Sequence, residues 1–255
     1  MSKNDYQHFT ISIAGIVIRI NTMYTRTYWM CKNYISELNP DFEISIAEID
    51  LIEEQILTLG TCERRMGGYL EPAAVHRKIA ERLTDYNAVL MHGAAISVNN
   101  KGYIFSGESG VGKTTHIKKW LNCNPNTFVV NGDKPIIRYI HDSFFVCGTP
   151  WSGKEHIDTN TMIELDSIAF MKRNADNIID RISFSHAFPR LLDQTFIHND
   201  ESNANRTLEL LIKMKDKVRF FDFLSNNMRE DSYQVAYKGL IGGIGNNENS
   251  ALEFH

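Results

Sequence analysis

The chain has 255 residues, a formal net charge of -4 at pH 7 and 43% hydrophobic residues. This length and composition are typical of one or two globular domains with a buried core. The mildly acidic balance excludes a general electrostatic attraction to nucleic acid or to anionic membranes. No apolar run reaches the roughly 20 residues of a membrane-spanning helix. The first residues lack the basic-then-apolar pattern of a secretory signal, so we expect a cytoplasmic protein.

The first third of the chain is predicted to begin with β-structure and to continue with helices. Its alternating and amphipathic patterns predict a strand pair over 8–20 that breaks near Gly15, a strand over 42–46, a helix over 47–59 and a helix over 72–86 with Pro72 in its first turn. No internal repeat is present in the sequence.

The middle of the chain is dominated by closely spaced short strands. Strands are predicted over 88–98, 102–106, 127–131, 135–140, 143–147 and 167–172, with hairpin turns at 99–102 and 140–143. Further along, helices are predicted over 187–197, 203–216 and 230–238, and a strand over 218–223. Because steady alternation of strand and helix is missing, we expect a mixed α/β fold with a largely antiparallel sheet rather than a doubly wound parallel sheet.

The stretch from Gly107 to Thr114 matches the phosphate-binding pattern G-x-x-x-x-G-K-[ST]. In such a P-loop the glycines let backbone N–H groups point at phosphate oxygens, and the following helix adds its positive dipole end. Lys113 would reach the outer phosphates and the hydroxyl of Thr114 would hold Mg²⁺. The predicted nucleotide-binding residues are Gly107, Glu108, Ser109, Gly110, Val111, Gly112, Lys113, Thr114 and Thr115. The alternative is a glycine-rich turn that matches the pattern by chance.

Three further motifs accompany this loop in a fixed order. They are "MHGAAISV" at 91–98, "NGDKP" at 131–135 and "GTPWSGKE" at 148–155. Together with "GYIFSGESGVGKTTH" at 102–116, they resemble the HPr kinase/phosphoenolpyruvate carboxykinase-like superfamily, and among its members the small bacterial carboxykinase-related proteins. The resemblance implies a P-loop on a strongly bent mixed sheet with flanking helices, a carboxykinase-like nucleotide-binding fold.

The resemblance also implies ATP-dependent phosphoryl transfer, with ATP or GTP as the nucleotide and Mg²⁺ or Mn²⁺ as the metal. We expect one kinase-like domain over 1–242, with a β-rich lead-in over about 1–80, a P-loop core over about 85–240 and a flexible tail over 243–255. Full carboxykinases are about twice as long, so carboxykinase activity itself is not expected.

Catalytic roles follow from the same motifs, residue by residue. His92, Asp133, Lys113 and Lys154 are the predicted catalytic residues, with Thr114 and Asp133 as metal ligands and Lys134 and Arg190 as substrate-binding residues. The structural alternatives are a buried strand histidine for His92, a turn aspartate before a proline for Asp133, and surface positions for the lysines and for Arg190. His116 is expected to face solvent or a neighbouring helix.

The sequence departs from the family at Gly132, where most relatives carry the first of two adjacent acidic residues. If that carboxylate is the usual base, His92 or Glu108 must replace it, or the chemistry has changed. The glycine also raises the question of a positive φ, in which aspartate would be strained.

Two functions therefore remain open. One is a kinase that transfers the γ-phosphate to a hydroxyl of a small metabolite, or of a serine in a peptide or protein. The other is a nucleotide-binding sensor or accessory protein with little transferase activity. Neither nucleic acid nor membrane is an expected partner, and the oligomeric state stays open.

Overall fold

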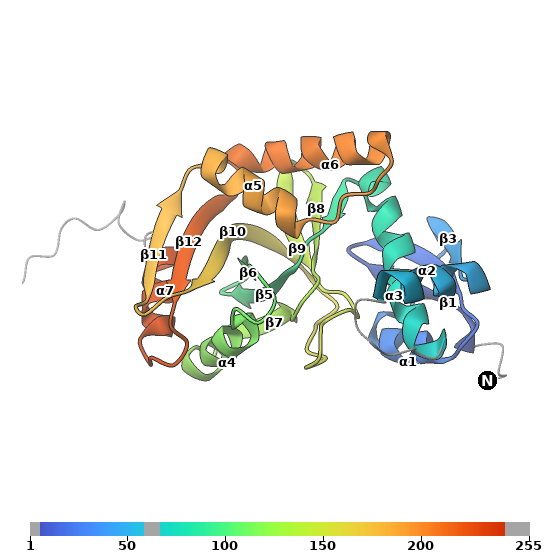
Figure 1. Cartoon of the computed structure of the whole chain (residues 1–255), viewed down its shortest axis with the longest axis horizontal. Coiled ribbons are helices and arrows are strands. Elements are labelled where there is room, and N and C mark those ends of the chain that lie inside the picture. Colours follow the sequence, from blue (N-terminus) through green and yellow to red (C-terminus); the bar gives the residue numbers. More distant parts are fainter. Residues whose placement is uncertain (1–5, 59–66, 243–255) are drawn as a thin grey trace, which may run out of the picture.

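The structure is a computed structural model that describes residues 6–58 and 67–242, so the tail predicted over 243–255 lies outside the described residues. Two sheets, one of three strands and one of nine, organise the chain. Figure 1 shows the smaller sheet with helices α1–α3 at one end of the molecule and the larger, strongly curled sheet at the other.

The N-terminal unit, residues 6–58 and 67–86, holds the three-stranded sheet. Its elements are β1 (His8–Ile13), β2 (Ile16–Asn21), α1 (Arg26–Cys31), η2 (Lys32–Tyr34), β3 (Phe42–Ser45), α2 (Glu48–Thr58), α3 (Gly67–Arg82) and η3 (Leu83–Tyr86). β1 and β2 pair antiparallel across a turn at Ala14 and Gly15, and β3 pairs parallel with β2. The predicted strand pair and its break near Gly15 are therefore confirmed.

Helix α3 begins at Gly67, five residues before the predicted start, so Pro72 lies inside the helix and not in its first turn. Tertiary contacts hold this early segment helical. The fully buried carboxylate of Glu71 accepts hydrogen bonds from the backbone N–H of Met23 and of Tyr24 and from the hydroxyl of Thr27. These bonds offset the helical hydrogen bond that Pro72 cannot donate.

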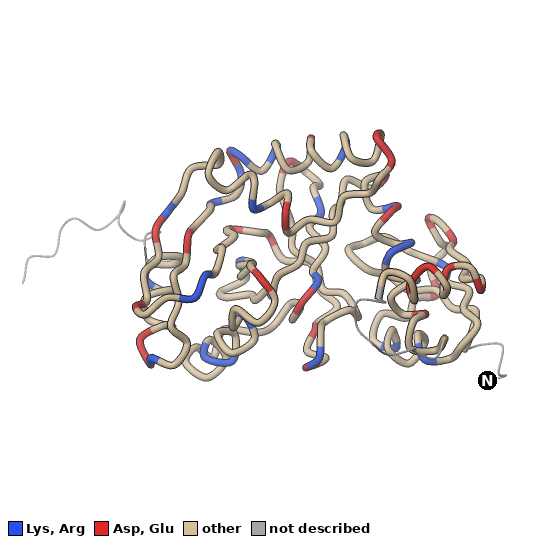
Figure 2. The backbone as a smooth tube through the Cα atoms, in the orientation of Figure 1, with Lys and Arg blue, Asp and Glu red and all other residues tan. Residues whose placement is uncertain are grey.

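Opposite charges join α2 to α3. Arg77 forms ion pairs with Glu53 and Glu54, and Lys78 pairs with Asp50. Figure 2 shows acidic positions of α2 beside basic positions of α3. The polar face of α2 is thus turned toward its neighbouring helix.

The larger sheet contains β4 (Ala88–Leu90), β5 (Gly93–Val98), β6 (Lys101–Ser106), β7 (Thr127–Asn131), β8 (Ile136–Ile140), β9 (Ser143–Cys147), β10 (Met162–Arg173), β11 (Ile178–Ile182) and β12 (Arg219–Ser225). Its order is β4-β8-β9-β10-β6-β5-β7, and β12 lies between β10 and β11. The pairs β10–β6 and β10–β12 are parallel and the other described pairs antiparallel. The prediction of a mixed, largely antiparallel sheet is confirmed.

Strand β10 produces the curl of this sheet. Residues Met162 to Glu164 pair antiparallel with β9, whereas the later residues pair parallel, with β6 from Leu165 to Phe170 and with β12 from Ser167 to Arg173. One long strand thus changes neighbours along its length, and the sheet bends around it (Figure 1). The sequence predicted only the second half of β10 and did not predict β11 or α1.

Helices cover both faces of the larger sheet. α5 (Phe184–Gln194) and α6 (Glu201–Lys213), followed by η4 (Met214–Asp216), pack on one face, while α4 (Lys113–Cys123) and α7 (Ser232–Leu240) pack on the other. Within the described residues, no helix is both long and apolar enough to cross a bilayer.

The prediction for His116 is wrong. Its side chain is fully buried between α4 and the sheet, and its ring contacts Phe105 and Phe223. Its Nε2 accepts a hydrogen bond of 2.9 Å from the indole of Trp120. Burial, together with the charge of Lys119, lowers the pKa of His116 to about 3.

The hydrophobic core runs from one sheet to the other. A single cluster of buried residues includes Ile11 and Ile18 of the N-terminal unit together with Leu90, Ile136 and Cys147 of the larger sheet. The two parts therefore share packed apolar contacts. The limits of the single domain predicted over 1–242 stay a prediction.

Candidate active site

The segment 107–112 connects β6 to α4, so the glycine-rich motif follows a strand and precedes a helix. Gly107 and Gly112 have φ angles of 143° and 107°, which L side chains rarely adopt. A Cβ on Gly107 would lie 2.6 Å from the carbonyl oxygen of Met171, and one on Gly112 would collide with the side chain of Asn227. Glycine is therefore required at both ends of this loop.

The loop leaves backbone donors free. Among the described residues, the N–H groups of Glu108, Ser109, Gly110 and Gly112 have no hydrogen-bond acceptor. Its carbonyls are instead braced from outside, because Arg173 of β10 donates to Gly110 O and Asn227 donates to Gly112 O. No sequence motif pointed to Arg173 or Asn227 as supports of the loop.

Lys113 is enclosed by this loop. Its side chain is buried, and Nζ donates to the carbonyl oxygens of Gly107 at 2.8 Å and of Glu108 at 3.1 Å. Burial lowers the pKa of Lys113, and the negative charge of Asp133 acts in the opposite direction. The lysine charge is thus held at the loop by two carbonyl oxygens, near enough to Asp133 for the two charges to act on each other.

A cavity of about 500 Å³, here called cavity B, opens beside Lys113. It is lined by Thr114 and Thr115 from α4, by His92 and Asp133, and by Ser152, Gly153, Lys154, Glu155 and Ile157. Four separate sequence motifs therefore meet at one cavity, including all four predicted catalytic residues.

His92 lies where the predicted strand 88–98 is interrupted. The structure divides this segment into β4, which pairs with β8, and β5, which pairs with β6 and β7. The side chain of His92 is about one-third exposed, with Nε2 3.4 Å from Oδ1 of Asp133 and Nδ1 3.1 Å from Oε1 of Gln194. The ring contacts side chains at the cavity wall and is not a buried strand histidine.

Gln194, the last residue of α5, is a site residue that the sequence did not reveal. Its backbone oxygen accepts from the N–H of His92 at 2.7 Å, and its side-chain amide donates to Asp193. The donation to Asp193 leaves the amide oxygen of Gln194 facing His92, which places a proton on Nδ1 and turns Nε2 toward Asp133.

Asp133 is held in a turn by a buried asparagine. Oδ1 of Asn131 accepts from the N–H of Asp133 and from that of Lys134, while Nδ2 of Asn131 donates to Thr149. The turn thus leaves the carboxylate of Asp133 free to face the cavity.

The carboxylate of Asp133 is kept charged by its surroundings. Burial acts against the charged form, but the hydrogen bond from His92 and the positive charges of His92, Lys134 and Lys113 outweigh it. The pKa of Asp133 consequently lies below its ordinary value.

Glycine is required at position 132 because another segment of the backbone lies close to it, and not because its φ is positive. It is absent from the described residues with φ above zero, and a Cβ there would lie 2.6 Å from the carbonyl oxygen of Ser152. The segment 148–160 therefore occupies the space in which a side chain at position 132 would begin. The sequence could not show this, because the contact joins two distant loops.

Lys154 lies at the exposed tip of that segment and lines cavity B. Its neighbour Glu155 pairs with Lys118 of α4 at 3.2 Å. The side chain of Trp151 contacts α3, since its ring stacks on His76 and its Nε1 donates to the carbonyl oxygen of Pro72.

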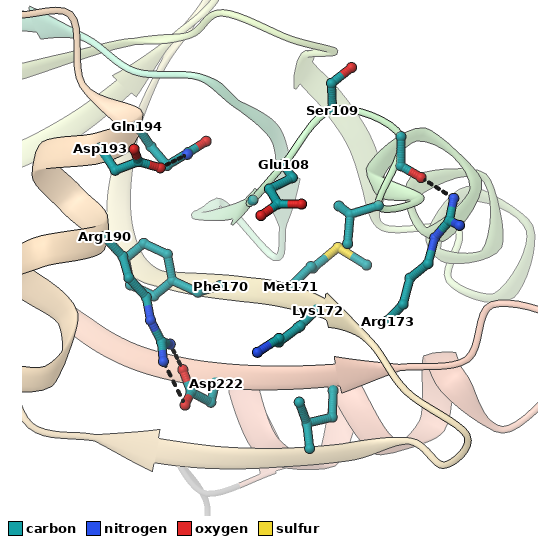
Figure 3. A pocket seen from close by; sticks show the side chains of 14 residues that line it. Glu108, Ser109, Phe170, Met171, Lys172, Arg173, Arg190, Asp193, Gln194 and Asp222 are labelled. Atoms are coloured by element: carbon teal, nitrogen blue, oxygen red, sulfur yellow. Dashed lines mark hydrogen bonds and ion pairs between the residues drawn. The ribbon is translucent and has the colours of Figure 1, made fainter.

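A second cavity of about 570 Å³, here called cavity A, lies on the other side of the loop and shares Ser109 and Gly110 with cavity B. Figure 3 shows it between α5 and the strands, with Glu108 and Lys172 pointing into it. Arg190 belongs to this cavity, where it pairs with Asp222 and lies over the ring of Phe170.

The structure thus separates the predicted residues into two groups. Lys113, Thr114, Thr115, His92, Asp133 and Lys154 line cavity B, whereas Glu108, Val111 and Arg190 line cavity A. Glu108 does not share a cavity with Asp133. Lys134 lines neither cavity, although its charge acts on Asp133 and on the buried His76.

Two side-chain groups with oxygens of the kind that can hold a metal, the hydroxyl of Thr114 and the carboxylate of Asp133, line the same cavity. Within the described residues, no group of three or more His, Cys, Asp or Glu side chains is placed to hold a metal ion. This arrangement fits Mg²⁺, which proteins commonly bind through one or two side chains while substrate phosphates and water complete its shell.

The chain was compared with family models, curated proteins and solved structures. No family model and no curated protein sequence match the chain. Among solved structures, the chain is similar to the Hpr(Ser) kinase/phosphatase from Coxiella burnetii, with a TM-score of 0.35 and 9% identity over 61% of this chain and 99% of that one. A similarity of this size does not establish a shared family, so membership of the superfamily named above stays a prediction.

Proposed function

We propose that this chain is an ATP-dependent phosphotransferase of the HPr kinase/carboxykinase-like type, which transfers the γ-phosphate to a hydroxyl group. The observation that supports it most is the convergence on cavity B of a loop lysine, a helix-start threonine, a charged aspartate and an imidazole. Phosphoryl transfer depends mainly on positioning and on charge stabilisation, and these groups supply both.

The nucleotide phosphates bind along the loop 107–112 in this proposal. The free N–H groups of the loop and the N-terminus of α4 attract phosphate oxygens. Lys113 exchanges its hydrogen bonds with two loop carbonyls for bonds to phosphate. Thr114 and Asp133 hold the Mg²⁺, which when bound neutralises part of the phosphate charge. GTP and Mn²⁺ are the alternatives for nucleotide and metal.

Transfer takes place in cavity B. The acceptor oxygen forms a bond to the γ-phosphorus while the bond from that phosphorus to the β,γ-bridging oxygen breaks, and the nucleoside diphosphate leaves. The hydroxyl proton passes to the carboxylate of Asp133 or, when the imidazole of His92 is neutral, to its Nε2, and both groups line this cavity. Lys154 adds positive charge from the overlying segment.

The nucleoside is assigned to cavity A. This cavity begins at the same loop and is floored by apolar side chains of Val111, Phe170, Met171 and Leu224, against which a flat base can pack. Arg190, predicted to contact the acceptor, would then be nearer to the nucleoside than to the transferred phosphate.

One observation favours the second function, a nucleotide sensor. The space of a side chain at position 132 is taken by the Ser152 carbonyl, so this chain has one acidic residue at a point where relatives of the predicted family carry two. A sensor would bind nucleotide and transfer nothing.

Labelled ATP separates the two functions. The protein is incubated with γ-labelled ATP and Mg²⁺ against metabolite pools and peptide libraries, with Lys113→Ala as the inactive control. Transfer that depends on Lys113 supports the kinase. Tight binding of nucleotide with no transfer to any pool supports the sensor, and absence of both binding and transfer rules out the phosphate-loop assignment.

A further inference from the structure

The segment 148–160, which carries Lys154, is attached to the N-terminal unit at both of its ends. At the first end, Trp151 Nε1 donates to the carbonyl oxygen of Pro72 at 2.8 Å, and its ring stacks on His76 with centroids 4.7 Å apart. Both partners belong to α3. This end of the segment is thus fixed to a helix outside the larger sheet.

At the second end, a single residue, Asp158, joins three parts of the chain through its side chain and its backbone. Asp158 accepts a hydrogen bond of 2.8 Å from the hydroxyl of Tyr34 on Oδ1 and one of 2.5 Å from the hydroxyl of Ser152 on Oδ2. Asp158 also forms an isolated β-bridge with Asn131, which holds the Asp133 turn. The bond to Ser152 closes the stretch 152–158 on itself, and the bond to Tyr34 fixes the closed stretch to η2.

Tyr34 is well suited to hold this carboxylate. Its side chain is 1% exposed, so the bond from its hydroxyl is shielded from competing water. Burial and the neighbouring Asp158 both raise the pKa of the hydroxyl, which keeps its proton available for donation.

The closed stretch lies directly on the turn that carries Asp133. A Cβ on Gly132 would lie 2.6 Å from Ser152 O, and one on Gly153 would lie 3.0 Å from Cβ of Asp133. At such distances a shift of the stretch changes the separation of Lys154 from Asp133 and from the phosphate loop. The position of Lys154 therefore depends on what fixes the stretch.

We propose that Tyr34 is a positioning residue of the active site. Through Asp158 it fixes the stretch 152–158 against the Asp133 turn and so places Lys154 at cavity B. The N-terminal unit then contributes to the active site, because it fixes the segment that carries Lys154. The proposal rests on the proposed phosphotransferase function for the role of Lys154, whereas the attachment of the stretch can be measured without any ligand.

The first experiment measures amide hydrogen exchange of the protein without nucleotide. Tyr34→Phe removes only the hydroxyl, and Asp158→Asn is the second variant. Tyr86→Phe is the matched control, because the Tyr86 hydroxyl bonds to Asp41 O within the same N-terminal unit. We expect exchange over 152–158 to become about tenfold faster in Tyr34→Phe and Asp158→Asn and to stay unchanged in Tyr86→Phe. Unchanged exchange in both test variants would overturn the proposal.

The second experiment tests whether Tyr34 acts through Lys154. The affinity for a non-hydrolysable ATP analogue is divided by that for ADP, because a lysine beside the γ-phosphate favours the triphosphate. The ratio is measured in the wild type, Tyr34→Phe, Lys154→Ala, the double variant and Tyr86→Phe. We expect Tyr34→Phe to lower the ratio about threefold to tenfold and to have no further effect when Lys154 is alanine.

The outcomes separate the two proposals. If the ratio falls equally with and without Lys154, or if exchange rises while the ratio stays constant, Tyr34 does not position Lys154. If the wild type binds neither nucleotide, the proposed function fails, and the exchange data still decide whether Tyr34 fixes the stretch.

Discussion

Nε2 of His92 lies 3.4 Å from Oδ1 of Asp133, and the charge of Lys113 acts on the same carboxylate. The histidine comes from the break between β4 and β5, and the aspartate comes from the turn between β7 and β8. A carboxylate and an imidazole at one cavity wall can share the proton of an attacking hydroxyl.

Replacing Asp133 by asparagine is expected to lower phosphate transfer by at least about 100-fold while nucleotide binding stays measurable, because a charged metal-binding or proton-accepting group is lost. Transfer rates with labelled ATP and binding calorimetry test this. Asp142→Asn, at an exposed carboxylate paired with Lys217, is the control. Wild-type transfer rates in Asp133→Asn would show that this residue serves only the turn.

Replacing His92 by glutamine is expected to lower transfer by at least about tenfold with little change in the affinity for Mg-ATP. Glutamine retains hydrogen bonding but cannot accept the hydroxyl proton as imidazole does. If both residues handle the same proton, the double variant with Asp133→Asn loses less than the product of the two single effects. If the double variant instead loses the full product of the two single effects, His92 and Asp133 act independently of each other.

Lys113→Ala is expected to weaken nucleotide affinity by about 10-fold to 100-fold, because a charged donor to phosphate is removed. The melting temperature should change by only a few degrees, since the lysine bonds loop carbonyls and not the core. Lys101→Ala, which removes a surface lysine paired with Glu164, is the control for charge. Equal affinity of Lys113→Ala and the wild type for nucleotide would contradict the interpretation of residues 107–114 as a P-loop.

Gly132→Ala is expected to destabilise the protein by about 1–3 kcal/mol, because the added Cβ meets the Ser152 carbonyl at 2.6 Å. An aspartate there, which would add the second acid of the predicted family, should lower stability at least as much and displace Lys154. Gly68→Ala is the matched control, since its Cβ would make an ordinary contact of 3.5 Å. Urea unfolding of the two alanine variants measures the difference. Equal stabilities would show that the segment 148–160 moves aside freely.

The buried His116 should make the protein less stable in mild acid. Burial lowers its pKa to about 3, whereas an unfolded histidine titrates near about 6.5, so the unfolded state binds more protons between these values. Stability is therefore lost as the pH falls below about 6.5. One such histidine accounts for about 2 kcal/mol between pH 7 and pH 5.

His116→Gln keeps an acceptor for the indole of Trp120 but does not titrate. We expect its loss of stability between pH 7 and pH 5 to be smaller than that of the wild type by this amount. Urea unfolding at both pH values measures it, with the exposed His8→Gln as control. An unchanged pH dependence in His116→Gln would mean that His116 binds its proton equally well in the folded and the unfolded protein.

Local patterns predicted most strands and both hairpins of the larger sheet. The turn residues explain this success, since Asn99, Asn100, His141 and Asp142 all have the positive φ that tight hairpins use. The order of the four motifs also identified His92, Lys113, Asp133 and Lys154, which meet at cavity B. Short-range conformational preferences and motif spacing were sufficient for these features.

Other features depend on contacts between distant segments and carry no local signal. The bond between His92 and Gln194 spans 102 positions, and that between Tyr34 and Asp158 spans 124. The early start of α3 depends on the partners of Glu71 in another segment. β11 is largely exposed and lacks the alternation that marks a half-buried strand, so its pattern is weak.

The contact of His92 with Gln194 has a consequence for protein synthesis. The ribosome completes the glycine-rich loop and the Asp133 turn well before it reaches position 194. Until α5 has been translated and has packed on the sheet, His92 lacks both the backbone and the side-chain bond that orient it. A chain released before α5 therefore lacks the residue that orients His92 and also lacks Asn227, which donates to Gly112 O of the glycine-rich loop. An oriented imidazole and a braced glycine-rich loop therefore occur together only in chains translated beyond Asn227.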